Sequence, residues 1–141
     1  MKRVFLLSIL ALTISLLVAG CCACRKGNNN LPLVGTEWQL RRMMGQDVHP
    51  KADQFVFTFS PEGNFSGVGA CNHLMASYKS NDKGALQIGP LAGTRRMCPD
   101  QALEAEFTKI ASRITHYEVD GNMLMLLSNG EVHAILQAVN R

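Results

Sequence analysis

The amino-acid sequence predicts an α+β domain in which a mainly antiparallel, curled, half-barrel-like β-sheet carries one principal α-helix. Three observations lead to this prediction. Short segments rich in β-branched and aromatic residues recur along the chain, separated by turn-forming residues. Two pairs near the C-terminus, Asp120-Gly121 and Asn129-Gly130, are typical of tight hairpin turns. One segment, 100–114, has apolar residues at helical spacing.

The strands are expected wherever a short apolar or alternating segment is bounded by turn residues. Trp38 is a candidate core anchor in the first strand, and the alternation in 55–59 places three phenylalanines on one face. Turns are predicted at 61–64 and 81–84 from their residue types. The last three strands form a β-meander. The predicted strands are 37–40, 55–59, 65–70, 75–79, 86–88, 115–119, 122–127 and 131–138.

The helix is predicted over 100–114 from a single apolar stripe that includes Leu103, Phe107 and Ile110. Pro99 is tolerated at a first helical position, and acidic residues gather near this end, where the helix dipole favours them. One helix covers only part of a sheet of seven or eight strands. We therefore expect the sheet to curl and bury the rest of its inner face.

The N-terminus has the three parts of a bacterial lipoprotein signal peptide: basic residues, an apolar run over 4–17, and the small residues Val18-Ala19-Gly20 before Cys21. Residues 1–20 are predicted to be this signal peptide, and Cys21 to receive lipid. The alternatives are an uncleaved transmembrane helix and a cytosolic protein with an apolar first helix. The apolar run is short for a membrane span, which needs about 20 residues.

Lipidation of Cys21 would place the protein at the bacterial cell envelope. A diacylglyceryl group carries at least two chains, so membrane attachment would be stable. No aspartate follows Cys21, which favours the outer membrane; whether the domain faces the periplasm or the cell exterior stays open. Residues 21–33 are expected to form the lipidated N-terminus and a flexible linker, and 34–141 the folded domain.

The charge balance argues against a nucleic-acid partner. The whole chain has 14 Lys and Arg against 11 Asp and Glu, and two of the basic residues lie in the predicted signal peptide. A nearly neutral domain lacks the basic stripe that nucleic acids require. We expect a monomer that contacts the membrane through lipid and binds an unidentified envelope protein.

Four short motifs occur in order along residues 33–138. They comprise an opening strand, a glycine-rich strand, a loop before the helix, and acidic residues in the helix. Their residues are Gly35, Trp38 and Leu40; Gly67, Cys71 and Asn72; Thr94, Arg95, Cys98 and Pro99; and Glu104 and Glu106. Together these motifs resemble those of the META domain (HslJ-like) family. Two departures are Ala70, where glycine is usual, and Arg96, an additional arginine in the loop.

The resemblance implies a compact β-rich domain, often part of an envelope lipoprotein, with no established enzymatic activity. In some members it implies a link to stress, motility or antibiotic tolerance. It implies no mechanism and no cofactor.

Cys71 and Cys98 have three alternative states. The oxidising envelope favours a disulfide between them, but two buried thiols, or a metal or catalytic role, stay open. Cys22 and Cys24 lie beside the predicted lipid and are expected to be incidental. Acylation would consume Cys21, so no tetrahedral metal site is expected there.

No catalytic group is expected from the other motif residues. Cys71 and His73 would face one side of a strand, but an oxyanion site is missing from the pattern. Asn72 and Thr94 are expected to satisfy backbone groups. Arg95 and Arg96 could bind an anion or a partner near the helix start. The favoured interpretation is that Arg95 pairs with Glu104 or with loop carbonyls.

Three functions are consistent with the sequence. The first is a membrane-anchored envelope lipoprotein whose non-enzymatic domain binds a partner or supports stress tolerance. The second is a small-ligand carrier that uses the inside of the curled sheet. The third is a thiol enzyme that uses Cys71 or Cys98.

Overall fold

The structure is a computed structural model that describes residues 29–139. The predicted signal peptide, the predicted lipid acceptor Cys21 and the first part of the predicted linker lie outside the described residues. Within the described part of the chain, no helix has both the length and the apolarity to cross a membrane.

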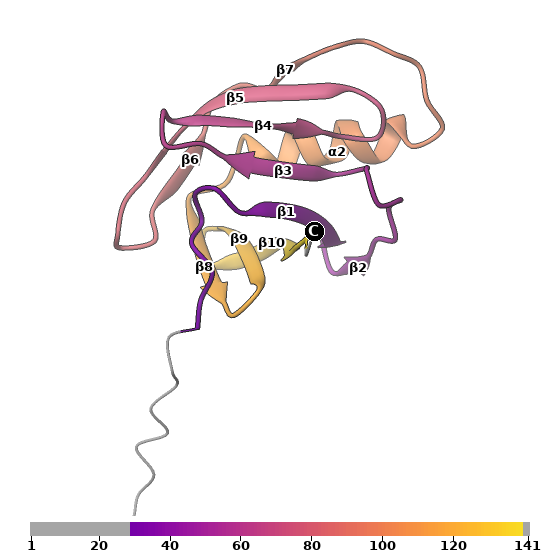
Figure 1. Cartoon of the computed structure of the whole chain (residues 1–141). Coiled ribbons are helices and arrows are strands. Elements are labelled where there is room, and N and C mark those ends of the chain that lie inside the picture. Colours follow the sequence, from indigo (N-terminus) through magenta and orange to yellow (C-terminus); the bar gives the residue numbers. More distant parts are fainter. Residues whose placement is uncertain (1–28, 140–141) are drawn as a thin grey trace, which may run out of the picture.

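The described chain consists of β-strands and one long helix (Figure 1). All eight strands that the sequence predicts are present, with ends that differ by up to three residues. The elements are β1 (Glu37–Met43), β2 (Gln46–Asp47), β3 (Val56–Phe59), β4 (Asn64–Val68), β5 (His73–Ser80), β6 (Leu86–Ile88), β7 (Ala92–Gly93), α2 (Gln101–Ala111), β8 (His116–Asp120), β9 (Met123–Ser128) and β10 (Glu131–Ala138).

The strands form one antiparallel sheet of ten strands in the order β6-β5-β4-β3-β1-β10-β9-β8, with β2 paired to β1 and β7 to β5. The sheet curls until its two edge strands approach each other at one end. There a single bridge joins Ala85 to His116, and the amide of Leu86 donates to the carbonyl of Thr115 at 3.0 Å. The sheet is not closed into a barrel. The predicted α+β class and half-barrel-like curvature are therefore confirmed.

Helix α2 packs its apolar stripe against the inner face of the sheet (Figure 1). The ring of Phe107 stacks on that of Phe57 with centroids 4.5 Å apart, and Phe57 stacks on Phe65 at 5.1 Å. Trp38 is fully buried, and its indole Nε1 donates to the carbonyl of Leu33 at 3.1 Å. Aromatic side chains thus fill the space between sheet and helix.

The elements differ from the sequence prediction in three places. The helix ends at Ala111, because the chain turns there with Arg113 N donating to Ile110 O; Ile114 is still buried. Pro99 precedes the N-cap residue Asp100 and is not the first helical residue. The sheet has ten strands because β2 and β7, each of two residues, are too short to produce a sequence pattern.

The beginning of the described chain and the loop before α2 lie at opposite ends of the domain (Figure 1). Asn30 accepts a hydrogen bond from Gly121 N through its side chain at 2.8 Å, and Leu31 N donates to Gly121 O at 2.9 Å. These contacts hold the incoming chain against the β8–β9 turn. The end of the domain that continues toward Cys21 is therefore remote from the loop between β7 and α2.

Candidate functional site

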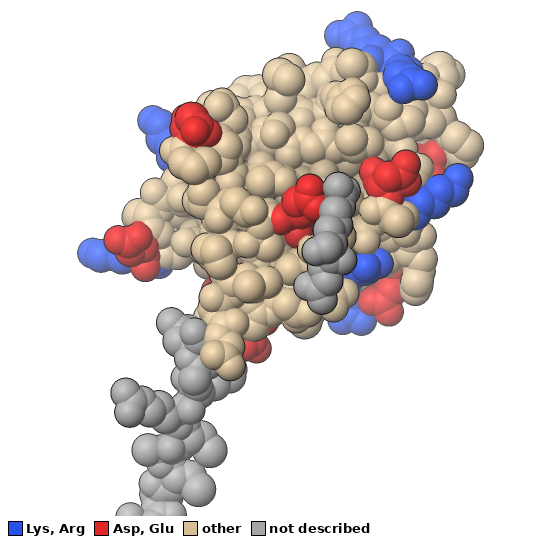
Figure 2. Space-filling view, viewed as in Figure 1, with Lys and Arg blue, Asp and Glu red and all other residues tan. Residues whose placement is uncertain are grey.

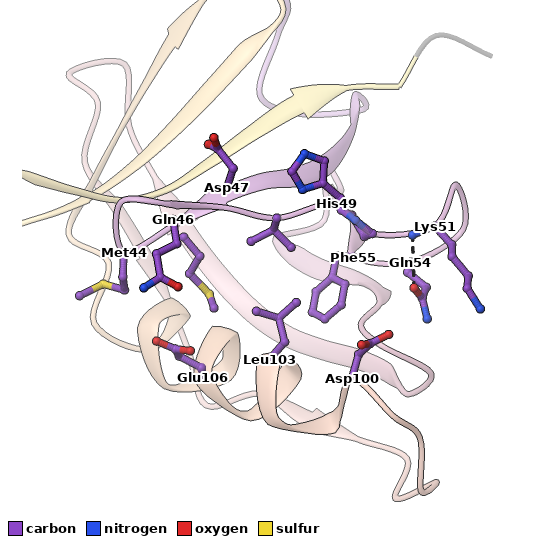
Figure 3. A pocket seen from close by; sticks show the side chains of 13 residues that line it. Met44, Gln46, Asp47, His49, Lys51, Gln54, Phe55, Asp100, Leu103 and Glu106 are labelled. Atoms are coloured by element: carbon purple, nitrogen blue, oxygen red, sulfur yellow. Dashed lines mark hydrogen bonds between the residues drawn. The ribbon is translucent and has the colours of Figure 1, made fainter.

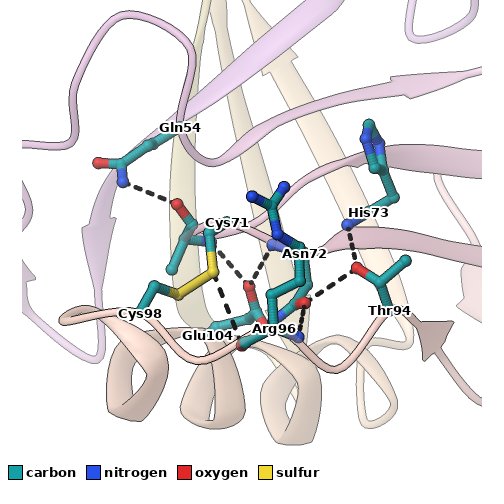
Figure 4. The surroundings of a disulfide bond; sticks show 9 residues. Gln54, Cys71, Asn72, His73, Thr94, Arg96, Cys98 and Glu104 are labelled. Atoms are coloured by element: carbon teal, nitrogen blue, oxygen red, sulfur yellow. Dashed lines mark hydrogen bonds between the residues drawn. A yellow bond between two sulfur atoms is a disulfide. The ribbon is translucent and has the colours of Figure 1, made fainter.

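A buried carboxylate joins α2 to the turn between β4 and β5 (Figure 4). Glu104, in the first turns of α2, is only 8% exposed. Its Oε2 accepts hydrogen bonds from Ala70 N at 2.8 Å and Asn72 N at 3.3 Å. Its Oε1 accepts one from Asn72 Nδ2 at 2.7 Å. The carboxylate thus serves as the acceptor that this turn needs for its backbone amides.

Asn72 connects the same turn to the loop that follows β7. Its Oδ1 accepts hydrogen bonds from Thr94 Oγ1 at 2.9 Å and from Arg96 N at 2.6 Å. Its Nδ2 donates to Arg96 O at 3.2 Å in addition to Glu104. Both amide protons and both carbonyl lone pairs are therefore in use. No hydrogen-bonding group of this buried side chain is left for a ligand.

A disulfide joins the two segments beside this network. Cys71 and Cys98 are bonded, with their Cα atoms 6.2 Å apart and 27 positions apart in the sequence. Thr94 N donates to His73 O, and Thr94 Oγ1 accepts from His73 N, both at 3.1 Å. We call residues 94–98 the pinned loop, because Thr94 and Cys98 fix its two ends to the β4–β5 turn.

The middle of the pinned loop extends into solvent. Met97 is 88% exposed, and Arg95 and Arg96 are also exposed. Among residues 29–139, neither arginine forms an ion pair. Figure 2 shows basic side chains projecting at the top of the molecule, over the loop that leads into α2. The pinned loop therefore presents two guanidinium groups and one apolar side chain on a fixed backbone.

This geometry corrects one interpretation from the sequence. Arg95 does not pair with Glu104, because the backbone and side chain of Asn72 and the amide of Ala70 occupy the carboxylate oxygens. Asn72 and Thr94 do satisfy backbone groups, as expected. The sequence analysis did not predict the hydrogen bond between Glu104 and Asn72. Both residues belong to family motifs, but they are 32 positions apart, and no local sequence pattern indicates that they meet.

Close packing explains the motif glycine Gly67 and also Gly69, which is not a motif residue. A Cβ on Gly67 would overlap the carbonyl of Val56 and lie 2.7 Å from the ring of Phe57. A Cβ on Gly69 would lie 2.9 Å from Glu104 Cγ. Ala70 does not have a positive φ angle, so the alanine that replaces the usual glycine fits without strain.

The remaining candidate groups are dispersed. Cys71 is bonded to Cys98, so neither sulfur is a thiolate nucleophile in this state. His73 is exposed at the start of β5, whereas His116 and His133 lie on β8 and β10, on the other side of β1 in the sheet order. Within residues 29–139 no three His, Cys, Asp or Glu side chains are grouped so that they could hold a metal ion.

The interior of the sheet offers little room for a ligand. Phe55, Phe57 and Phe59 are each at most 1% exposed, and Phe55 also meets the ring of Phe107 edge-on at 6.4 Å. These side chains occupy the volume that a carrier would need to keep open. The packing therefore argues against a carrier that uses the inside of the curled sheet.

The chain is similar to several solved structures. A protein from Burkholderia xenovorans, determined by NMR, shares 27% identity at a TM-score of 0.61 over 77% of this chain and 85% of that one. A DUF4847 family protein from Bacteroides vulgatus shares 17% identity at a TM-score of 0.61 over 77% and 94% of the two chains. The second likeness concerns the fold alone.

A search of functionally curated proteins finds no significant relative. The family model of the META domain, in contrast, matches residues 31–140, which include every motif described above. The chain therefore belongs to the META domain family.

Proposed function

We propose that this protein is a lipid-anchored envelope lipoprotein whose META domain is a non-enzymatic binding module. The pinned loop is its binding element, and an envelope protein is its partner. Lipid on Cys21 holds the module to the outer membrane, and the module contributes to tolerance of envelope stress.

The main support for this proposal is that the pinned loop exposes two charged side chains and one apolar side chain on a backbone that is held in place. Met97 is 88% exposed, while the residues on either side of the loop centre are held by a disulfide and by Asn72. Exposed methionine and arginine are favoured in binding surfaces, because both cover a large area and adapt to a partner. A fixed backbone lowers the entropy cost of binding.

The position of the loop is compatible with an anchor at Cys21. The described chain begins at the β8–β9 turn, at the end of the domain opposite the pinned loop (Figure 1). A short linker toward the membrane would leave the loop directed away from the bilayer. A partner in the envelope space could then reach Arg95, Arg96 and Met97.

The proposal of a non-enzymatic role is supported by the state of the polar groups near the loop. The Asn72 amide and the Glu104 carboxylate are buried and occupied by protein partners. Both cysteine sulfurs are bonded to each other. A catalytic site needs a nucleophile, a base and an oxyanion-stabilising group that a substrate can reach together.

The test is crosslinking in intact cells followed by affinity purification of the full-length protein. The wild-type chain is expected to enrich a specific envelope protein. Arg95→Glu combined with Arg96→Glu is expected to reduce that enrichment at least about tenfold, because two charge reversals in an interface each cost more than a surface pair contributes. Met97→Ser is expected to reduce it less.

The matched control is Lys83→Glu combined with Lys109→Glu, which makes the same charge change at exposed sites outside the loop. Equal enrichment by the wild type and the loop variant, with both proteins equally abundant, would contradict the proposal.

The anchor has a separate test. Metabolic labelling with a palmitate analogue should mark the wild-type protein, and Cys21→Ser should remove the label and release the protein from membranes. If Cys21→Ser stays labelled and membrane-bound, the lipid acceptor is another residue and the assignment to Cys21 is wrong. A deletion strain challenged with envelope stresses, complemented by each form, then tests the physiological role.

A further inference from the structure

A groove lies on another part of the domain, between segment 43–55 and the first turns of α2 (Figure 3). Its volume is about 540 Å³, the size of a site for a small molecule or a few side chains. Figure 3 shows the ring of Phe55 beside the side chain of Leu103. Met43 and Val48 extend the apolar lining on the side of the β1–β2 hairpin. Phe55 and Met43 are almost fully buried, so the accessible apolar surface of the groove comes from the partly exposed Leu103 and Val48.

Two carboxylates flank this apolar surface on the helix side. Asp100 and Glu106 stand on either side of Leu103 along α2, and both are exposed. Asp100 occupies the N-cap position, but its side chain makes no capping hydrogen bond. Neither carboxylate forms an ion pair with any of residues 29–139. The helix side of the groove therefore presents two negatively charged side chains that form no ion pair with the described residues.

The opposite wall adds little charge to the groove. Asp47 is paired with Arg42 at 2.7 Å, and its side chain points away from the helix in Figure 3. Lys51 lies at one end, where its side chain extends outward. A ligand that complements the groove should therefore carry positive charge on either side of an apolar group.

Two residues that line the groove, Met44 and Phe55, have positive φ angles, which are unfavourable for their side chains. Met44 has φ +47° in the tight turn Met44-Gly45, a conformation that suits asparagine. The turn Asn129-Gly130 has nearly the same angles, φ +52° and +83°, with the favoured residue in place. Phe55, at the other end of the segment, has φ +53°. Residues with strained backbone angles concentrate at binding sites. The turn itself does not favour methionine at position 44, so we attribute the presence of Met44 to its side chain, which lines the groove.

Hydrogen bonds hold the groove open in its present shape. Gln39 Nε2 donates to Lys51 O at 2.7 Å and to Gln54 O at 3.0 Å. Gln54 Nε2 in turn donates to Ala70 O at 2.7 Å. The wall over 51–55 is therefore fixed to β1 and to the β4–β5 turn before any ligand arrives.

We propose that this groove binds a peptide segment of a partner protein that carries a long apolar side chain between two basic residues. The apolar side chain lies against the partly exposed Leu103 and Val48, over the buried ring of Phe55, and the basic residues pair with Asp100 and Glu106. Asp100 and Glu106 are six residues apart, which corresponds to about 9 Å along the helix axis. An extended peptide covers this distance in about three residues. This site is distinct from the pinned loop, whose charge has the opposite sign.

The test is an NMR titration of the full-length chain in a non-ionic detergent with a defined peptide pool. The pool has the pattern Ser-Arg-Xaa-Ser-Arg-Ser, with Leu, Met or Phe at Xaa. Saturable shifts at the groove residues are expected, with a Kd below about 1 mM. Glu106→Gln should weaken binding about twofold to fivefold, since one exposed ion pair is removed. The same peptides with Glu in place of Arg should not bind.

Met44→Asn separates a binding role from a structural one. It should weaken peptide binding and also raise the melting temperature by about 2–5 °C, because asparagine suits the turn. Asn129→Met is the matched turn control: it should lower the melting temperature without changing peptide affinity. Glu118→Gln is the charge control, and Arg95→Glu with Arg96→Glu should leave groove binding unchanged.

Three results would overturn the proposal: no saturable shifts with the pool, equal binding by the Asp100→Asn/Glu106→Gln double variant, or shifts of the groove signals that follow the concentration of the protein itself. The last would identify a second copy of the chain as the occupant.

Discussion

Replacing Glu104 by glutamine should destabilise the domain far more than its small change in shape suggests. The two carboxylate oxygens accept three hydrogen bonds, from Ala70 N, Asn72 N and Asn72 Nδ2. Glutamine has one oxygen and one amide group at these positions. Whichever way the glutamine amide is oriented, its N–H group faces another donor, so at least one buried donor loses its acceptor.

The expected destabilisation is about 2–4 kcal/mol. A hydrogen bond to a charged group contributes about 1.5–3 kcal/mol, and a buried donor without an acceptor costs about 1–3 kcal/mol. For a domain of this size the melting temperature should fall by about 10 °C. Glu106→Gln, two residues along the same helix but exposed, should change stability by no more than about 0.5 kcal/mol.

Urea unfolding followed by tryptophan fluorescence measures both variants. Trp38 is the chain's one tryptophan and is fully buried, so its emission should shift to the red on unfolding. If Glu104→Gln and Glu106→Gln have the same unfolding midpoint, the carboxylate does not stabilise the β4–β5 turn and the reasoning fails.

A double-mutant cycle assigns the effect to one contact. Combining Glu104→Gln with Asn72→Ala should cost less than the sum of the single substitutions by about 1 kcal/mol or more, because the two side chains share a hydrogen bond. Additive effects would instead mean that Glu104 acts through the backbone amides alone.

Three further predictions concern other parts of the domain. Cys71→Ser with Cys98→Ser should lower the free energy of unfolding by about 3.5 kcal/mol, from the loop of 27 positions that the disulfide closes, as measured by urea unfolding. Gly67→Ala should cost about 1–3 kcal/mol in the same assay, because the added methyl group overlaps a neighbouring strand. The hydrogen bond from Arg42, followed by its charge, lowers the pKa of Asp47. This pair therefore stabilises the fold above the unfolded-state pKa of Asp47 and loses that effect as the pH falls through the lowered value. An NMR titration of the carboxyl group should show the lowered pKa, and Arg42→Ala should raise it.

The sequence alone determined the class of fold and most of its elements. The turns at Gly121 and at Asn129-Gly130 define the C-terminal meander, because the positive φ angles of these three residues suit few other residue types. The apolar stripe around Phe107 defines the helix because its period differs from that of a strand. The motifs around Trp38, Asn72 and Cys98 were sufficient for the family, since they combine residue types at set positions.

The same sequence left the candidate site undecided. Glu104 and Asn72 are 32 positions apart, and nothing local distinguishes a buried helical glutamate from the exposed Glu106. The sequence favours Arg95 as a partner of Glu104 or of loop carbonyls, whereas the side-chain partner of Glu104 is Asn72. The packing of α2 against the β4–β5 turn determines which groups donate hydrogen bonds to Glu104. A buried carboxylate must be hydrogen-bonded, and its partners are the donors that the fold places beside it.

Local sequence patterns therefore determined the secondary structure of each segment, and tertiary contacts determined the hydrogen-bond partners of the polar side chains. Turns and periodicity depend on neighbours within a few residues, which the sequence contains. The disulfide beside Asn72, the exposed tip at Met97 and the groove over Leu103 depend on segments that meet only after the sheet curls around the helix. Their geometry is a property of the assembled fold and not of any one segment.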